Sequence, residues 1–176
     1  MSKKIYIITG PAGVGKSTIS KALARKLSKS AYINGDMISH MAVAGRENPW
    51  ESKDSHELIL KNINDLTSNF LTTGYDVVID WIFLWGNIKK YMLNWINEGI
   101  EVHYVILWSK ESINKLRDEK RPLDIQMGKR VQVLRNEFLN SKADSRFYLD
   151  NTNDYIDDVL SLIVNDNRFL ISRRDL

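Results

Sequence analysis

The chain has 176 residues, enough for one globular domain with a sizeable core and too few for two. Hydrophobic residues make up 43% and charged residues 27%, and the absence of cysteine excludes disulfides, thiolate metal sites and a cysteine nucleophile. The net charge is +3, and residues 110–135 hold eight Lys/Arg against four Asp/Glu. Such a local excess suits a polyphosphate more than a long nucleic-acid track, so no nucleic-acid partner is expected.

The amino-terminal segment does not have the pattern of a targeting sequence. Its apolar run covers only residues 5–8, which is shorter than a signal-peptide core. No stretch approaches the roughly 20 apolar residues of a membrane span. We therefore expect a cytoplasmic protein without a membrane partner, either a monomer or a homodimer.

Short β-branched runs alternate with longer amphipathic stretches along the chain. In chain order, the pattern predicts a strand at 5–9, a helix at 15–28, a strand at 31–34, a helix at 51–73, a strand at 77–80, a helix at 87–98, a strand at 103–107, helices at 109–119 and around 131–138, a strand at 147–149 and a helix from about 153. This alternation is typical of a parallel sheet covered by helices on both faces. The predicted fold is a single α/β domain over 1–176, a three-layer α/β/α sandwich with a five-stranded parallel sheet.

The loop after the first predicted strand matches the P-loop pattern G-x-x-x-x-G-K-[S/T]. Glycines in this loop let the backbone turn tightly and point its N–H groups at phosphate, while Lys16 reaches the β/γ-phosphates and the Ser17 hydroxyl ligates Mg²⁺. An apolar strand before the loop and a helix after it favour this interpretation over an incidental glycine-rich turn. The expected nucleotide-binding residues are Gly10, Ala12, Gly13, Val14, Gly15, Lys16, Ser17 and Thr18.

The remaining motifs narrow the class of P-loop protein. A GTPase needs Asn-Lys-x-Asp after a strand, and the nearest string, at 114–118, has the wrong spacing and falls in a predicted helix. A switch-type Asp-x-x-Gly is missing after the third strand. The chain is also too short for a large oligomeric motor, which leaves the small kinases.

Four features together resemble the small-molecule kinases of the adenylate-kinase-like fold, the group that holds gluconate kinase, shikimate kinase and chloramphenicol phosphotransferase. They are the P-loop at 10–17, Asn-Gly-Asp at 34–36, Asp80 at the end of the third strand, and the Arg-rich stretch 117–130. The resemblance implies a P-loop NTPase fold with sheet order 2-3-1-4-5. It also implies that a small helical lid, at about 117–130, covers the nucleotide.

The resemblance also implies roles on the acceptor side. Asp36 would contact the acceptor hydroxyl and accept its proton, although an Asp here also suits a helix cap. Asp80 would hold Mg²⁺ through water or touch the acceptor, although it could simply begin a turn. Trp81 could wall the acceptor pocket or pack in the core, and Arg46 could pair with a substrate carboxylate.

On the nucleotide side, arginines of the lid are expected to stabilise the transferring phosphoryl group. Arg121 and Arg130 are the preferred pair, acting with Lys16 in catalysis, and Arg117 would stack on adenine. Asn151 and Thr152 follow the fifth strand, where related kinases contact the base through backbone groups, although capping of the last helix explains them equally well.

The sequence therefore predicts an enzyme that uses ATP and Mg²⁺ to phosphorylate a hydroxyl of a small molecule. A gluconate-like sugar acid and an antibiotic-type alcohol both remain open as acceptors. A nucleoside or nucleotide kinase is the alternative within the same class. A sensor protein that binds ATP without catalysis is the alternative from another class.

Overall fold

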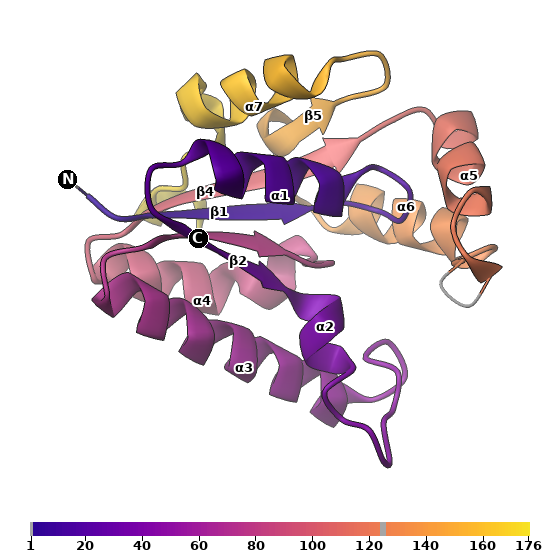
Figure 1. The fold of residues 1–176 in the computed structure, drawn as a ribbon, viewed down its shortest axis with the longest axis horizontal. Coiled ribbons are helices and arrows are strands. Elements are labelled where there is room, and N and C mark those ends of the chain that lie inside the picture. The colour runs from indigo at the N-terminus through magenta and orange to yellow at the C-terminus, as the bar shows by residue number, and fades with distance from the viewer. Residues whose placement is uncertain (1, 124–125) are drawn as a thin grey trace.

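The computed structural model describes residues 2–123 and 126–176 and contains the predicted alternation of strands and helices (Figure 1). Single-turn 3₁₀ helices cover Ser145–Phe147, Asn167–Phe169 and Arg173–Asp175. The longer elements are β1 (Lys4–Thr9), α1 (Lys16–Lys26), β2 (Ser30–Asn34), α2 (Gly35–Ser39), α3 (Lys53–Thr72), β3 (Asp76–Asp80), α4 (Trp85–Asn97), β4 (Glu101–Trp108), α5 (Glu111–Glu119), α6 (Arg130–Asn140), β5 (Tyr148–Asp150) and α7 (Ile156–Asn165).

The five strands form one parallel sheet in the order β2-β3-β1-β4-β5, which confirms the predicted α/β fold and strand order. The register pairs Ile8 of β1 and Asn34 of β2 with the same residue of β3, Asp80. The carboxyl ends of these three strands therefore lie level with one another. Ligands of open α/β sheets bind at such an edge.

Helices cover both faces of the sheet, with α1 and α7 on one side and α3 and α4 on the other (Figure 1). Ile5 and Ile7 of β1 face the α3/α4 side, while Tyr6 and Ile8 face the α1/α7 side. Because both faces are covered, β1 is a continuous apolar run and its residues 5–9 are almost fully buried.

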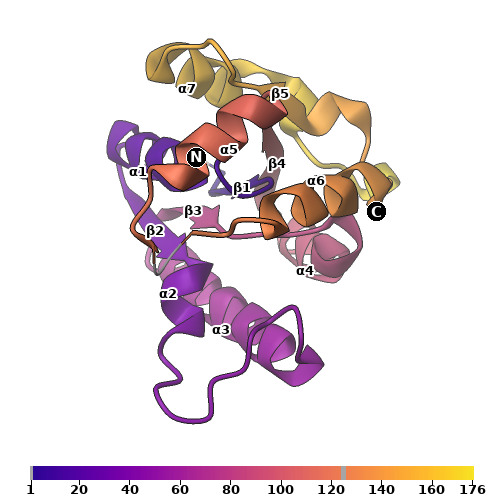
Figure 2. The same cartoon turned by 90° about the vertical axis from the view of Figure 1, so that its right-hand side faces the viewer.

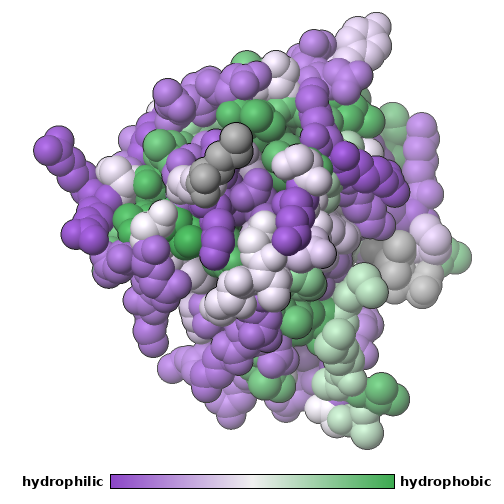
Figure 3. All heavy atoms as spheres, turned by 60° about the vertical axis from the view of Figure 1, so that its left-hand side comes forward, coloured by the Kyte–Doolittle hydropathy of each residue, from purple (hydrophilic) through white to green (hydrophobic). Residues whose placement is uncertain are grey.

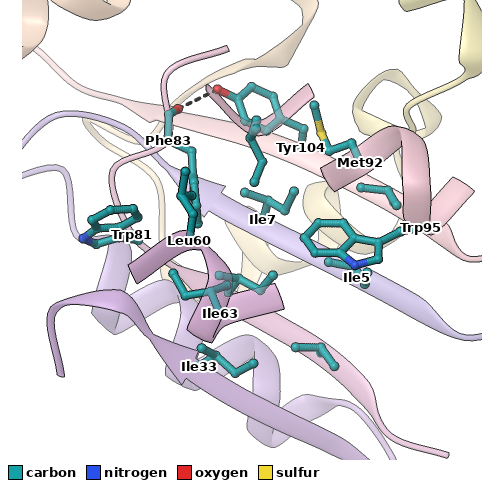
Figure 4. Packing of buried hydrophobic residues seen from close by; sticks show 14 of the residues in the cluster. Ile5, Ile7, Ile33, Leu60, Ile63, Trp81, Phe83, Met92, Trp95 and Tyr104 are labelled. Carbon is teal, nitrogen blue, oxygen red and sulfur yellow. Dashed lines mark hydrogen bonds between the residues drawn. The ribbon is translucent and has the colours of Figure 1, made fainter. Parts of the chain in front are cut away.

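The core on the α3/α4 side is rich in aromatic side chains (Figure 4). Trp95 is buried beside Ile5, and the Tyr104 hydroxyl donates to the Phe83 carbonyl oxygen at 2.8 Å. This bond ties the segment after β3 to β4. The position of the chain just beyond Asp80 is therefore set by the core.

The outer surface is mainly polar. Hydrophilic residues cover most of the face in Figure 3, with smaller hydrophobic areas between them. Within the two described ranges, no helix combines the length and the apolar character needed to traverse a bilayer.

Candidate active site

The P-loop connects β1 to α1 at the carboxyl edge of the sheet, and α2, α5 and α6 surround this edge (Figure 2). Gly13 has a φ of 78°, and a Cβ atom there would collide with the backbone carbonyl of Asn114 in α5. Only glycine tolerates both the positive φ and the close approach of the Asn114 carbonyl. Glycine is therefore required at the point where the loop passes directly against α5.

Lys16 lies where several charges of the site converge. Its Nζ donates to two carbonyl oxygens of the loop itself, both at 3.0 Å. Burial lowers the pKa of Lys16 below its usual value, and the Asp80 and Asp36 carboxylates partly oppose this shift. The Arg121 guanidinium adds to the lowering. The charges that influence the P-loop lysine thus include two carboxylates and one guanidinium that were predicted from the sequence.

A cleft of about 350 Å³ opens beside the P-loop. Asn151 donates from Nδ2 to the Val14 carbonyl oxygen at 2.8 Å, and Arg117 donates from Nη1 to the same oxygen at 3.4 Å. These two side chains therefore frame the loop from the β5 and α5 sides. The expected nucleotide-side residues that line the cleft are Gly13, Val14, Gly15, Thr18, Arg117, Arg121 and Asn151.

Thr152 and Arg130 do not line this cleft, and neither do the P-loop residues Gly10, Ala12, Lys16 and Ser17. Thr152 Oγ1 accepts a hydrogen bond from the Lys110 backbone N–H at 3.0 Å, so it joins the β5–α7 and β4–α5 connections. The Arg130 guanidinium instead lies over the Trp50 ring, 4.7 Å from its centroid, with Nη2 3.8 Å from Glu137 Oε1. Of the preferred arginine pair, the structure brings only Arg121 to the P-loop.

Asp80 is 2% exposed and is held by two neighbours on β2. Its Oδ2 accepts from the Tyr32 hydroxyl at 2.8 Å and from Asn34 Nδ2 at 3.0 Å. Burial, followed by the negative charge of Asp80, raises the pKa of Tyr32 to about 12, so the hydroxyl remains a donor at neutral pH. No role was predicted for Tyr32 or Asn34, although polar residues near the end of a buried strand can indicate a functional site.

Asp36 lies in the first turn of α2 and is exposed to solvent. The helix cap is the preceding Asn34, whose Oδ1 accepts from the Met37 backbone N–H at 2.8 Å. The Asp36 carboxylate is therefore not needed for capping. This leaves it available at the carboxyl end of β2, where α2 begins.

Trp81 and Arg46, both expected at the acceptor, have structural contacts. Trp81 is 4% exposed, and a Cβ atom on Gly35 would collide with its indole ring, so it packs in the core beneath α2. Arg46 donates from Nε to the Ser39 carbonyl oxygen at 3.2 Å and from Nη2 to Ser39 Oγ at 3.3 Å. It therefore binds the end of α2.

The predicted lid has an internal anchor that the sequence analysis missed. The Asp118 side chain is 4% exposed, and its Oδ2 accepts from the backbone N–H groups of Met127 at 3.0 Å and Gly128 at 2.9 Å. Arg121 Nη1 lies 3.6 Å from the other oxygen. Residues 124 and 125 of the lid lie outside the described residues. Asp118 stands among basic residues, and nothing in the sequence indicated that its side chain turns inward.

The comparison with protein families agrees with this geometry. A family model described as an AAA domain matches residues 5–146, well over half of the chain. The chain belongs to this AAA domain family. The match includes the P-loop, Asp36, Asp80 and the arginines of the predicted lid.

Individual relatives of this AAA domain protein are kinases. A cytidylate kinase of Chlamydia caviae is 42% identical over 55 residues, which are 31% of this chain and 26% of that protein. The match thus spans about a quarter of that relative's length. A shikimate kinase of Actinobacillus succinogenes is 27% identical over 156 residues, covering 81% of this chain and 83% of that protein.

Solved structures show the same fold. The APS kinase of Mycobacterium tuberculosis, in complex with AMPPNP and APS, superposes with a TM-score of 0.66 and 18% identity, covering 93% of this chain and 96% of that one. The resemblance of this AAA domain protein to P-loop small-molecule kinases is confirmed, and its P-loop is of the nucleotide-binding kind.

Proposed function

We propose that this protein transfers the γ-phosphoryl group of ATP to a hydroxyl of a small molecule. The observation that carries the proposal is the arrangement around the P-loop Lys16: Arg121 lines the cleft beside the loop, and Asp80 and Asp36 lie at the carboxyl ends of β3 and β2. Phosphoryl transfer depends mainly on positioning and on neutralising charge, and these four groups supply both. AMPPNP in the similar APS kinase supports ATP as the nucleotide.

The nucleotide would occupy the cleft of about 350 Å³ beside the P-loop. The adenine would lie between Arg117 and Asn151, which both line this cleft. The phosphates would follow the loop N–H groups to Lys16, and Arg121 would close over the transferring oxygens. Arg117 offers a planar cation, which stacks well on an aromatic base.

Mg²⁺ fits the oxygen donors of this site. The Ser17 hydroxyl is exposed at the start of α1, and the Asp80 carboxylate lies at the adjacent strand end. Asp80 Oδ2 already accepts two hydrogen bonds, so its remaining lone pairs suit a metal-bound water better than a direct metal bond. When bound, Mg²⁺ would neutralise charge on the β- and γ-phosphates.

Asp36 is the proposed base. As the acceptor oxygen forms its bond to the γ-phosphorus, the bond from that phosphorus to the bridging oxygen of ADP breaks, and the hydroxyl proton passes to the Asp36 carboxylate. The carboxylate is suited to this role because it is exposed and Asn34 already caps α2.

ADP release measured over a panel of acceptors tests the proposal. The panel contains gluconate, shikimate, aminoalcohol antibiotics and nucleosides, each with ATP and Mg²⁺. We expect at least one acceptor to raise ADP release well above the background hydrolysis of ATP. A rate that stays at background with every member would favour the sensor hypothesis, in which ATP binds without an acceptor.

A further inference from the structure

A second cleft, of about 480 Å³, opens on the other side of the sheet edge. It lies between the segment that leads into α3, the first two turns of α3 and the first turn of α4. Its volume is in the range of about 300–1,000 Å³ that is usual for small-molecule sites. The lining residues that bear on recognition are Trp50, Glu51, Lys53, His56, Glu57 and Asn87.

The inner wall of this cleft is joined to the acceptor side of the proposed site. The His56 ring packs on Trp81, with 5.3 Å between the ring centroids. Trp81 directly follows Asp80 and touches Gly35, the residue before Asp36. One indole ring therefore connects the cleft wall with the backbone of both candidate carboxylates.

The outer wall is joined to the phosphate side through Trp50, whose exposed fraction is 47%. The Arg130 guanidinium lies over this ring at the start of α6. The next residue, Val131, packs in one cluster with Ala12 of the P-loop. A partly exposed indole face is thus fixed beside the cleft, and such a face recognises flat or apolar groups.

The charges at the cleft offer little attraction to an anion, because the two cations beside it, Lys53 and Arg130, each lie close to a glutamate. Lys53 is the one basic side chain among the lining residues, and it faces Glu57 with an Nζ–Oε1 distance of 3.9 Å, while Glu51 adds a second carboxylate. Burial lowers the pKa of His56, so its ring is neutral at pH 7. The nearby Arg46 is bound to Ser39.

Resting on the proposed function, we propose that this cleft binds the acceptor and selects a neutral or cationic alcohol with a flat apolar face over one that carries a carboxylate or phosphate. Like charges that meet in a binding site reduce affinity, so the glutamates would disfavour an anionic acceptor. The proposal favours the antibiotic-type alcohol over the sugar acid.

Three benzyl alcohols that differ only at the para position test this selection. They carry an aminomethyl, a methyl or a carboxylate group, and ADP release gives kcat/KM for each. We expect the aminomethyl and methyl compounds to exceed the carboxylate by about tenfold or more, the factor that corresponds to about 1.4 kcal/mol. An equal or higher kcat/KM for the carboxylate would overturn the proposal.

A charge reversal with a matched control assigns the selection to the cleft. Glu57→Lys should reduce the preference against the carboxylate compound by about tenfold, again about 1.4 kcal/mol. Glu98→Lys, an exposed site at the opposite end of α4, should leave it unchanged. An unchanged ratio in Glu57→Lys, or an equal change in both variants, would overturn the proposal.

The acceptor class and the kinase function can be overturned separately. Background ADP release with all three benzyl alcohols, alongside turnover of a sugar acid or a nucleoside, would overturn the acceptor class and leave the kinase function standing. Background rates with those compounds and with the whole acceptor panel would overturn both.

Discussion

The side-chain amide of Asn34 donates to the Asp80 carboxylate at 3.0 Å, joining the end of β2 to the end of β3. The other end of the same amide accepts from the Met37 backbone N–H and caps α2. One side chain therefore fixes both Asp80 and the helix that carries Asp36. The spacing of the two candidate carboxylates depends on it.

Replacement of Asn34 by alanine should impair transfer more than nucleotide binding. The variant loses a cap, typically worth about 1 kcal/mol, and leaves Asp80 with one donor fewer. We expect kcat to fall by about tenfold to a hundredfold, since small misplacement of catalytic groups costs that much. ATP affinity measured without Mg²⁺ by calorimetry should change little. Asn94→Ala, on the exposed face of α4, is the control, and an equal loss there would contradict the assignment.

Asp36 and Lys16 should differ in their effects on binding and chemistry. Asp36→Asn is expected to keep nearly the same ATP affinity and to lower phosphoryl transfer by about 10²–10⁴, which is typical of losing a general base. Lys16→Ala should weaken both, because its charge acts on the phosphates directly. ATP titration and single-turnover rates of the two variants check this. Normal turnover in Asp36→Asn would remove Asp36 from the mechanism.

Asp118 should hold the lid segment in shape. Asp118→Ala leaves two partly exposed backbone N–H groups without their acceptor, and each lost hydrogen bond costs about 0.5–1.5 kcal/mol. We therefore expect faster proteolysis between α5 and α6 and about tenfold weaker ATP binding, since Arg117 and Arg121 flank this position. Glu119→Ala, its exposed neighbour, is the matched control. Cleavage at the same rate in the two variants would refute the anchoring role.

His103 should make the fold sensitive to acid. It is 4% exposed and stacks on Tyr6, and neither ring nitrogen has a hydrogen-bond partner among residues 2–123 and 126–176. Burial, aided by Lys4 and opposed by Glu101, lowers its pKa from 6.5 to about 4. The unfolded chain therefore binds a proton between these pH values that the folded chain does not. The stabilisation from neutral His103 is complete above about pH 6.5 and is lost as the pH falls toward 4.

The expected size of this effect is about 3 kcal/mol, at 1.36 kcal/mol per pKa unit. Urea unfolding at pH 7 and pH 4 should show that His103→Phe loses about that much less stability on acidification than the unmodified chain. The exposed His40→Phe is the control and should behave like the unmodified chain. The prediction fails if His103→Phe and the unmodified chain have the same pH dependence.

Much of the fold follows from local pattern. Five apolar runs separated by amphipathic helices were sufficient for the parallel sheet, because a strand covered on both faces must be apolar throughout. The strand order came from the family resemblance and is confirmed. The P-loop was predicted from its own motif, and the roles of Asp36 and Asp80 from the family resemblance, with both carboxylates placed after strand ends that a parallel sheet brings to one edge.

The roles of Arg121 and Arg130 depended on the tertiary structure. The two residues are alike in chemistry and stand nine positions apart in the same basic stretch. Arg121 lines the cleft beside the P-loop and lies 3.6 Å from Asp118, whereas the Arg130 guanidinium lies over Trp50, eighty residues earlier in the chain. The role of Trp81 was undecided in the same way, since an aromatic residue at a strand end can face either a pocket or the core. Here α2 packs on it and places it in the core.

The α/β pattern and the phosphate loop could be predicted without coordinates, because both arise from contacts between residues near one another in the chain. The tertiary structure decided which polar groups meet across the sheet edge, as Asn34 and Asp80 do. The physical reason is that such contacts join segments far apart in sequence, and packing of the core determines their positions to within a hydrogen bond.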